Sequence, residues 1–195
     1  MKKFIPVGVL LLILFMGGCY SCNTQRSLVN KDEAVKSAWA NVQTQYQRRA
    51  DLIDNLVATV KGAANFEKET LTAVIEARAS ASKITLNAND LTPEKLQQFQ
   101  ASQGQLSQAL GRLMVVSEQY PELKANQNFL ALQDEISGTE NRIAFSRTSF
   151  NDAVQAYNIT VRTFPNNLLA GMFGFQSKGM FEAVAGAQKA PKVKF

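Results

Sequence analysis

Four charged side chains within two turns of a predicted helix, Arg48, Arg49, Asp51 and Asp54, form a group that could bind a charged ligand. Arg49 falls on a stripe of apolar residues in heptad spacing. Its guanidinium must therefore either pair with an acid between helices or reach water along a seam. Two interpretations stay open: a structural ion pair, or a site for an anion or a protein partner.

A second polar group occupies a single helical turn. Glu140, Asn141 and Arg142 follow one another in a region with helical periodicity. Such side chains can cap or cross-link neighbouring helices, and they can also contact a partner. We include all three as candidate interaction residues.

The segment between two predicted long helices is the third candidate. It runs from Tyr120 and Pro121 to Asn126. Loops that a rigid scaffold holds in place often carry binding residues. We therefore expect these residues either to contact a partner or to close the end of the bundle.

The side-chain inventory argues against most catalytic and metal chemistry. The sequence has no histidine, and its two cysteines, Cys19 and Cys22, lie near the N-terminus. Zinc, haem and iron sites with the usual ligands are therefore not expected, and serine or threonine nucleophiles lack an imidazole partner. Carboxylates that could still converge on a calcium or magnesium ion are Glu76, Glu118, Glu135 and Glu140. We expect no catalytic residue, no metal site and no cofactor.

The charge distribution does not favour nucleic acid as a partner. The chain has 21 Lys and Arg against 16 Asp and Glu, a net charge of +5. Nucleic-acid binding requires a clustered basic face. Here the charges alternate in sign, except in the short tail that contains Lys189, Lys192 and Lys194.

The N-terminus has the pattern of a bacterial lipoprotein signal. Lys2 and Lys3 precede an apolar run over 4–16, and Gly17-Gly18 leads directly to Cys19, the predicted lipid-attachment residue. Met16 departs from the usual leucine. The alternative is an uncleaved transmembrane helix, because residues 4–22 carry no charge and would span about 28 Å as a helix. In both cases the lysines favour an inside N-terminus and an extracytoplasmic body.

The first helix of the body is predicted from a capping box and a heptad stripe. Asn30 and Glu33 form the capping box, so the helix should begin there. The apolar stripe continues over 35–77, across the weak helix formers Gly62 and Asn65. We therefore predict one long helix, straight or bent, rather than two.

Two more long helices follow. Thr92 as a cap and Pro93 in the first turn predict the start of the second helix, which ends before Pro121. The third begins near residues 126–128 and stops at Pro165. Over 165–187, glycines interrupt a Phe- and Met-rich sequence, which predicts a loop and then a short helix from about residue 178. This segment either seals the bundle or stays free to bind a partner or lipid.

The expected fold is all-α: an elongated antiparallel bundle of three long helices plus a shorter C-terminal helix. Residues 1–18 would be the signal peptide or membrane anchor and 19–29 a tether. Residues 30–187 would be the helical domain and 188–195 a disordered basic tail.

Several blocks of sequence together resemble the LemA family and extend over about residues 28–183. They are RRADLIDNLV (48–57), TVKG (59–62), EAR (76–78), YPELKAN (120–126), TENRIA (139–144), YN (157–158), FP (164–165) and FGF (173–175). The resemblance implies a four-helix-type bundle behind an N-terminal membrane anchor. It implies no activity, because the family's molecular function is unresolved, and for relatives a cytoplasmic body has been proposed. Asp54 and Phe66 stand where family members commonly have Pro and His.

Three functions remain as hypotheses. The first is a membrane-anchored interaction or scaffold module of the cell envelope that acts through protein partners and could self-associate. The second is a protein that binds lipid with its Phe- and Met-rich C-terminal segment. The third, which the side chains favour least, is an envelope hydrolase that uses carboxylates.

Overall fold

The computed structural model describes residues 5–62 and 66–182, without the side chains of residues 5–14, 17 and 19. The helices in these ranges are α1 (Ile5–Lys61), α2 (Lys68–Lys83), α3 (Pro93–Ser117), α4 (Pro121–Lys124), α5 (Gln127–Arg162) and α6 (Asn166–Met172). This part of the chain contains no strand, which confirms the predicted all-α fold. The predicted basic tail, 188–195, lies outside the described residues.

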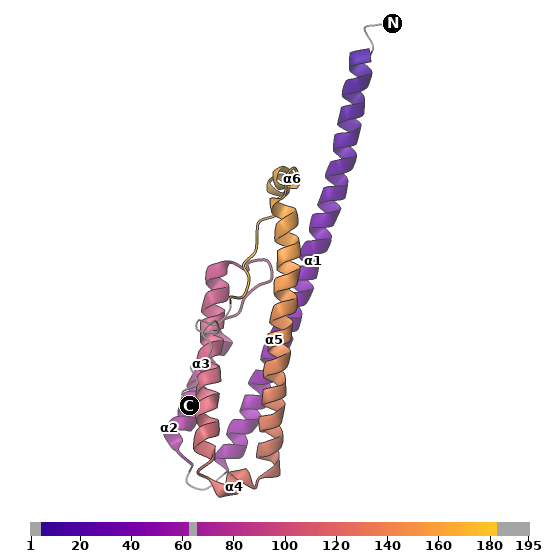
Figure 1. Cartoon of the computed structure of the whole chain (residues 1–195). Helices are drawn as coiled ribbons and strands as arrows, with labels where there is room; N and C mark the ends of the chain where they lie inside the picture. The colour runs from indigo at the N-terminus through magenta and orange to yellow at the C-terminus, as the bar shows by residue number, and fades with distance from the viewer. Residues whose placement is uncertain (1–4, 63–65, 183–195) are drawn as a thin grey trace, which may run out of the picture.

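The helices form an elongated bundle, as the sequence predicts (Figure 1). α1 runs the whole length of the molecule, α2 turns back, α3 runs down again, and α5 returns antiparallel to α1. Close backbone packing joins α1 to α5 and α2 to α3, whereas α3 and α5 stand further apart. The 57-residue α1 is about 85 Å long.

An aromatic cluster forms one of the two parts of the core. The ring of Trp39 in α1 lies 5.7 Å from Phe99 of α3, 5.4 Å from Phe150 of α5 and 6.1 Å from Phe181. Aromatic pairs at such distances each contribute about 0.5–1.5 kcal/mol beyond the burial of their surface. The cluster therefore ties three helices and the C-terminal segment together.

The helix start predicted at Asn30 is wrong. α1 passes without a break through residues 19–29, the expected tether. Leu28 is fully buried in the core, so the helix must already be packed against the bundle there. The Glu33 carboxylate pairs with Lys36 at 2.8 Å instead of closing a capping box.

The prediction of one helix across residues 62–67 is also wrong. α1 ends at Lys61, and α2 begins at Lys68. Folding back places Val60 and Val74 in the same core cluster, both fully buried. The apolar stripe keeps its phase across the break because both helices turn it toward one core. The fourth helix of the bundle is therefore α2, not a C-terminal helix.

The predicted boundaries of α3 and α5 are confirmed. The Thr92 hydroxyl accepts from the backbone N–H of Lys95 at 3.4 Å. The Asn126 side chain accepts from the N–H groups of Asn128 at 3.0 Å and Phe129 at 3.2 Å, which satisfies two free donors at the start of α5.

The C-terminal segment has its helix earlier than predicted. α6 occupies Asn166–Met172 and ends in a turn at Gly174, whose φ of 77° favours glycine. Residues 175–182 are not helical, so the helix predicted from about 178 is wrong for this stretch. We call residues 164–173 the tip and residues 175–182 the strap.

The strap lies along the bundle and seals its flank, as one of the two interpretations predicts. The Asn158 amide exchanges two hydrogen bonds with the backbone of Lys178, at 2.8 and 2.9 Å. Asn151 binds the backbone of Phe181 in the same way, with both distances 2.9 Å. The Tyr157 hydroxyl donates to the Gln176 carbonyl at 2.9 Å, and burial raises its pKa to about 12, so it keeps its proton.

Candidate functional site

Arg49 is the centre of a polar network that joins three helices. Its guanidinium is only 2% exposed and donates through Nη1 to Glu140 Oε1 of α5 at 2.6 Å. The same nitrogen donates to Ser107 Oγ of α3 at 3.1 Å, and Nη2 donates to Gln103 Oε1. The ion pair predicted for Arg49 is therefore confirmed, and its acid is Glu140.

Tyr46 completes this network one helical turn before Arg49. The Arg49 guanidinium carbon lies 5.1 Å from the centre of the Tyr46 ring, within the range of a cation–π contact. Burial raises the pKa of Tyr46, although the nearby charges of Arg147 and Arg49 act in the opposite direction. The tyrosine therefore stays protonated at neutral pH and can both donate and accept a hydrogen bond.

A groove of about 660 Å³ opens over this network between α3 and α5, and we call it the α3–α5 groove. Tyr46 and Arg49 line it from α1, and Glu140 and Arg147 from α5. One face of α3 contributes Gly104 and five glutamines: Gln97, Gln100, Gln103, Gln105 and Gln108. Its volume lies in the range that holds small molecules or short polypeptide segments.

The strap forms one end of the groove, where Met180 and Glu182 line it. Arg147 Nη2 donates to the Glu182 carbonyl at 3.2 Å, and Gln100 Nε2 donates to the same oxygen at 3.0 Å. The Arg147 guanidinium also lies 4.6 Å from the centre of the Phe181 ring. Side chains from both walls thus hold this end in place.

The remaining members of the predicted charged cluster point outward. Arg48 pairs with Glu135 of α5 at 2.5 Å, with both side chains exposed, so the pair contributes at most about 1 kcal/mol. Asp51 accepts from Gln47 Nε2 at 2.8 Å. The structure therefore separates Arg49, which faces the groove, from its neighbours in sequence.

The predicted loop acts in helix capping and in closing the end of the bundle. The Tyr120 ring packs against Phe66 with 4.8 Å between ring centres. Pro121 begins the short helix α4, and the Asn126 side chain caps α5. A role of this loop in binding a partner stays a prediction.

The residues of the 140–142 turn lie on different sides of α5. Glu140 faces the α3–α5 groove, whereas Asn141 and Arg142 line a separate hollow of about 440 Å³ beside α1. Phe145, which is 75% exposed, also lines that hollow. The three residues therefore do not form one site.

The described part of the chain has no group of three or more Cys, Asp or Glu side chains placed to hold a metal ion. Two of the four carboxylates that could converge are engaged elsewhere, because Glu135 pairs with Arg48 and Glu140 with Arg49.

The cysteines at the N-terminus are described only in part. Cys22 is an exposed free thiol on α1. The side chain of Cys19 lies outside the described residues, so lipid attachment there stays a prediction. Among the described residues, no helix is both long and apolar enough to cross a membrane.

Sequence reasoning missed the glutamine face of α3. Gln97, Gln100, Gly104 and Gln108 recur every three or four residues, which is the spacing of one helix face. This pattern predicts a polar face without charge on α3. The sequence gives no sign that α5 would stand far enough away to leave that face open.

The chain is similar in sequence to a known protein family and to several known proteins. The model of the LemA family matches residues 38–195. Protein LemA of Metamycoplasma hominis is 28% identical over 190 residues, which cover 93% of this chain and 83% of that protein.

Magnetosome proteins match a shorter part. Magnetosome protein MamQ 2 of Paramagnetospirillum magneticum is 37% identical over 79 residues, 40% of this chain and 29% of that protein. Magnetosome protein MamQ of Magnetospirillum gryphiswaldense is 34% identical over 73 residues, 37% of this chain and 27% of that protein. Because the family model matches most of its length, the chain belongs to the LemA family.

Proposed function

We propose that the protein is a membrane-anchored helical interaction module whose α3–α5 groove binds an extended segment of a protein partner. The observation that carries this proposal is the glutamine face of α3 beside the buried Arg49 network, on which Gln97, Gln105 and Gln108 are exposed. A glutamine amide offers both donors and an acceptor, so a row of them matches the alternating N–H and C=O groups of a peptide backbone.

The charges of the groove support a peptide over a nucleic acid. Arg49 and Arg147 are balanced by Glu140 and Glu182 among the lining residues. A nucleic acid would require a surplus of basic side chains. A neutral polar lining is better suited to the uncharged backbone of a polypeptide.

The floor of the groove is held in a fixed arrangement. Arg49 is fastened to Glu140, Ser107 and Gln103, which come from two other helices. A site that is already ordered loses less conformational freedom on binding. The side chains of the groove floor are therefore already ordered before a partner binds, which supports recognition by this groove.

The membrane anchor in this proposal rests on the N-terminal sequence. Lys2 and Lys3, the apolar run over 4–16 and the Gly17-Gly18-Cys19 junction support an anchor with an extracytoplasmic body. Intact-mass analysis of the protein extracted from membranes tests this part. Loss of residues 1–18 together with acyl chains on Cys19 is the expected result, and an unprocessed mass would instead favour the single-pass transmembrane helix.

Site-specific photo-crosslinking tests the groove. A photoreactive amino acid in place of Gln97 or Gln108 should give one discrete adduct with a protein partner in membranes, whereas one in place of Thr72 on α2 should not. The substitution Gly104→Trp should remove the adduct, because a Cβ at Gly104 meets only open space and the ring would fill the groove.

Gly111→Trp is the matched control. Gly111 also lies in α3 with open space around it, but it does not line the groove. The adduct should persist in this variant. If the adduct still forms in the Gly104→Trp variant, or forms equally from the photoreactive residue at position 72, the groove is not the binding site.

A further inference from the structure

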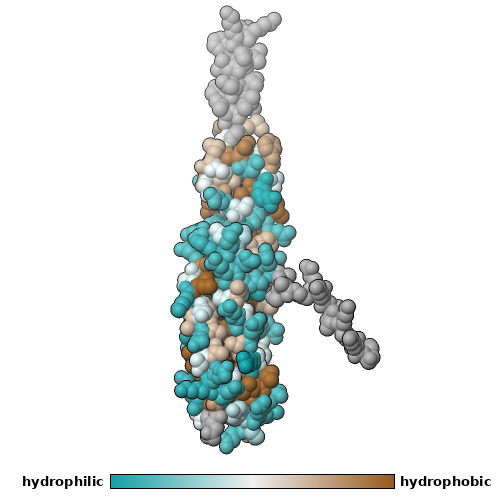
Figure 2. Space-filling view, turned by 90° about the vertical axis from the view of Figure 1, so that its left-hand side faces the viewer, coloured by the Kyte–Doolittle hydropathy of each residue, from teal (hydrophilic) through white to brown (hydrophobic). Residues whose placement is uncertain are grey.

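The tip carries a concentration of exposed apolar side chains. Phe164 is 76% exposed, Leu168 61%, Met172 79% and Phe173 40%. Leu168 and Met172 are four residues apart on α6 and so share one face of that helix. On the face shown in Figure 2, apolar residues lie at this end of the body, and others lie near the opposite end. Exposed patches of this kind mark contact surfaces.

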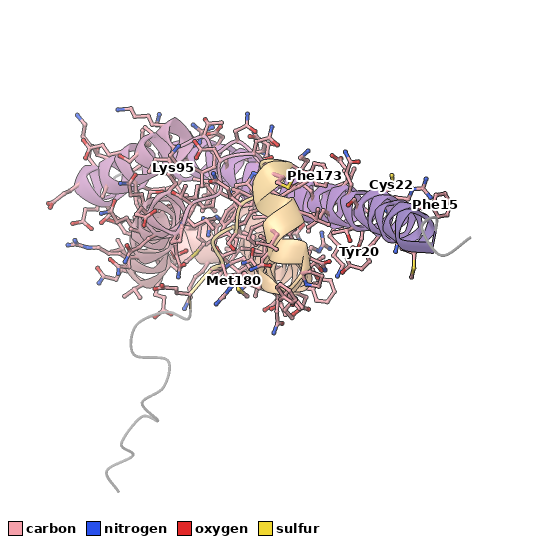
Figure 3. All side chains as sticks on the ribbon, turned by 90° about the horizontal axis from the view of Figure 1, so that it is seen from above. Phe15, Tyr20, Cys22, Lys95, Phe173 and Met180 are labelled. Atoms are coloured by element: carbon pink, nitrogen blue, oxygen red, sulfur yellow. The ribbon has the colours of Figure 1, made fainter. Side chains whose placement is uncertain are left out.

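α6 lies across the long axis of the bundle. It is seen end-on in Figure 1 and along its length from above in Figure 3. Asn166 at its start accepts from the Tyr20 hydroxyl at 2.7 Å and from the Thr24 hydroxyl at 3.3 Å, which fixes α6 against α1. Ala170, on the opposite face of α6, is 1% exposed, so Leu168 and Met172 point away from the bundle.

Acidic residues are absent from both chain segments at this end. No Asp or Glu occurs in residues 4–31 or 153–181 of the sequence, whereas Arg26 and Arg162 lie there and are exposed. The first acid along α1 is Asp32, and it pairs with Lys36 and Lys178, both at 2.9 Å. An apolar surface with basic and no acidic side chains matches the headgroup region of an anionic bilayer.

The position of α6 along α1 is consistent with contact to lipid headgroups, whether the anchor is a transmembrane helix or an acylated Cys19. Tyr20, which holds α6, lies two residues before Cys22, the last residue of the uncharged run over 4–22, or about 3 Å along the helix. The headgroup layer on each side of a bilayer is about 5–8 Å thick. If the uncharged run over 4–22 spans the hydrocarbon, Tyr20 lies at its outer edge, and α6 lies beside the boundary between hydrocarbon and headgroups. If Cys19 is acylated instead, its lipids enter the bilayer one residue from Tyr20.

We infer that the tip is a bilayer-binding surface: Phe164, Leu168, Met172 and Phe173 enter the headgroup region of an anionic membrane beside the anchor. This inference rests on the membrane anchor of the proposed function but not on its groove. A second point of contact beside the anchor fixes the tilt of the rod. The α3–α5 groove is then held at a defined height above the membrane.

Depth-dependent quenching in proteoliposomes of the full chain tests the inference. An environment-sensitive fluorescent amino acid replaces Met172 or, at the opposite end of the bundle, the exposed Val115. Vesicles contain phosphatidylcholine and phosphatidylglycerol at 3:1 with brominated acyl chains. We expect at least threefold stronger quenching at 172 than at 115, and weaker quenching at 172 when phosphatidylglycerol is omitted.

Two variants distinguish specific membrane binding by the tip from nonspecific hydrophobic adsorption. With the probe at 172, Phe164→Gln/Leu168→Gln/Phe173→Gln should reduce quenching to the level at 115. Ile75→Gln/Leu130→Gln/Phe145→Gln, which changes three exposed apolar residues elsewhere on the body, should leave it unchanged. Circular dichroism melting should be similar for both variants, because each of the six side chains is already at least 39% exposed.

Vesicle flotation distinguishes failure of the tip inference from failure of the proposed membrane anchor. A protein that floats with equal quenching at 172 and 115 retains its anchor and overturns the tip inference alone. A protein that does not float overturns the anchor, and with it the tip. Photo-crosslinking from position 172 to a second copy of the chain in place of lipid would also overturn the inference, because the patch would then be a dimer contact.

Discussion

The tip and the strap are neighbours in sequence and similar in composition, but they meet opposite environments. Both contain Phe, Met and Gly, yet Phe181 of the strap is 6% exposed and Phe164 of the tip is 76% exposed. The difference lies in what the rest of the chain offers each segment. Asn151 and Asn158, one heptad apart on α5, hold the strap by its backbone, whereas side chains of α1 hold the tip at Asn166. Composition alone does not decide which apolar residues are buried.

This comparison predicts that a substitution in the strap lowers the free energy of unfolding, whereas the matched substitution in the tip changes it little. The largest effect is expected from Phe181→Ala, which removes a ring packed against Trp39, Phe99 and Phe150. Truncation of a buried phenylalanine costs about 3–5 kcal/mol because a cavity remains. Urea denaturation followed by circular dichroism measures the change in the free energy of unfolding.

Phe173→Ala is the matched control in the tip. Its ring is 40% exposed and lies outside both core clusters, so we expect a change below about 1 kcal/mol. Equal losses from the two substitutions would mean that the tip is as much part of the core as the strap, and the contrast between them would fail.

The second prediction uses glycines in the two segments. A Cβ on Gly179 would lie 2.7 Å from the backbone nitrogen of Pro93, so Gly179→Ala must move the strap away from α3 and cost about 1–3 kcal/mol. Gly171 of α6 has open space around it, and Gly171→Ala should be neutral or slightly stabilising. Thermal melting of both variants checks the opposite signs.

The third prediction concerns the asparagines. Asn158→Ala leaves the backbone N–H and C=O of Lys178 without their protein partners, which should cost about 1 kcal/mol or slightly more. Asn167→Ala in the tip changes an exposed side chain and should cost less than about 0.5 kcal/mol. Hydrogen exchange at the Lys178 amide should accelerate in the first variant only. Unchanged exchange there would show that α5 does not hold the strap through this residue.

Much of the fold could be predicted from the sequence, since the heptad stripes and caps are local signals. Thr92 and Asn126 cap the helices that they were expected to begin. The break after Lys61 could not be predicted, because a chain that folds back keeps the same apolar phase as a chain that continues. The position of α6 also depends on contacts with Tyr20 and Thr24, more than 140 positions away.

The candidate site was predictable only in part. Arg49 on an apolar stripe implied either an acidic partner or a seam open to water, and Glu140 is one of several acids that spacing alone allows. The groove itself arises because α3 packs on α2 and α5 on α1, with the strap closing one end. Such a space between pairs of helices is a tertiary property, and no local pattern encodes its width.

The smallest expected effect concerns the ion pair that joins the strap to α1. Burial alone would raise the pKa of Asp32, but hydrogen bonds from Lys36 and Lys178 and their charges outweigh it and hold the pKa below its usual value of 3.8. Because the folded pKa is the lower one, the pair stabilises the protein fully above pH 3.8, and this contribution disappears as the pH falls through the folded pKa. Asp32→Asn should therefore lower stability at pH 7 by about 1 kcal/mol, because the amide oxygen can still accept from one lysine and Lys178 Nζ keeps its hydrogen bond to the Ala88 carbonyl. The gap from wild type should close on acidification to pH 2–3, and the exposed Asp152→Asn variant should show no such gap at pH 7. If the stability difference between wild type and Asp32→Asn persists at low pH, Asp32 supports the strap through packing rather than charge.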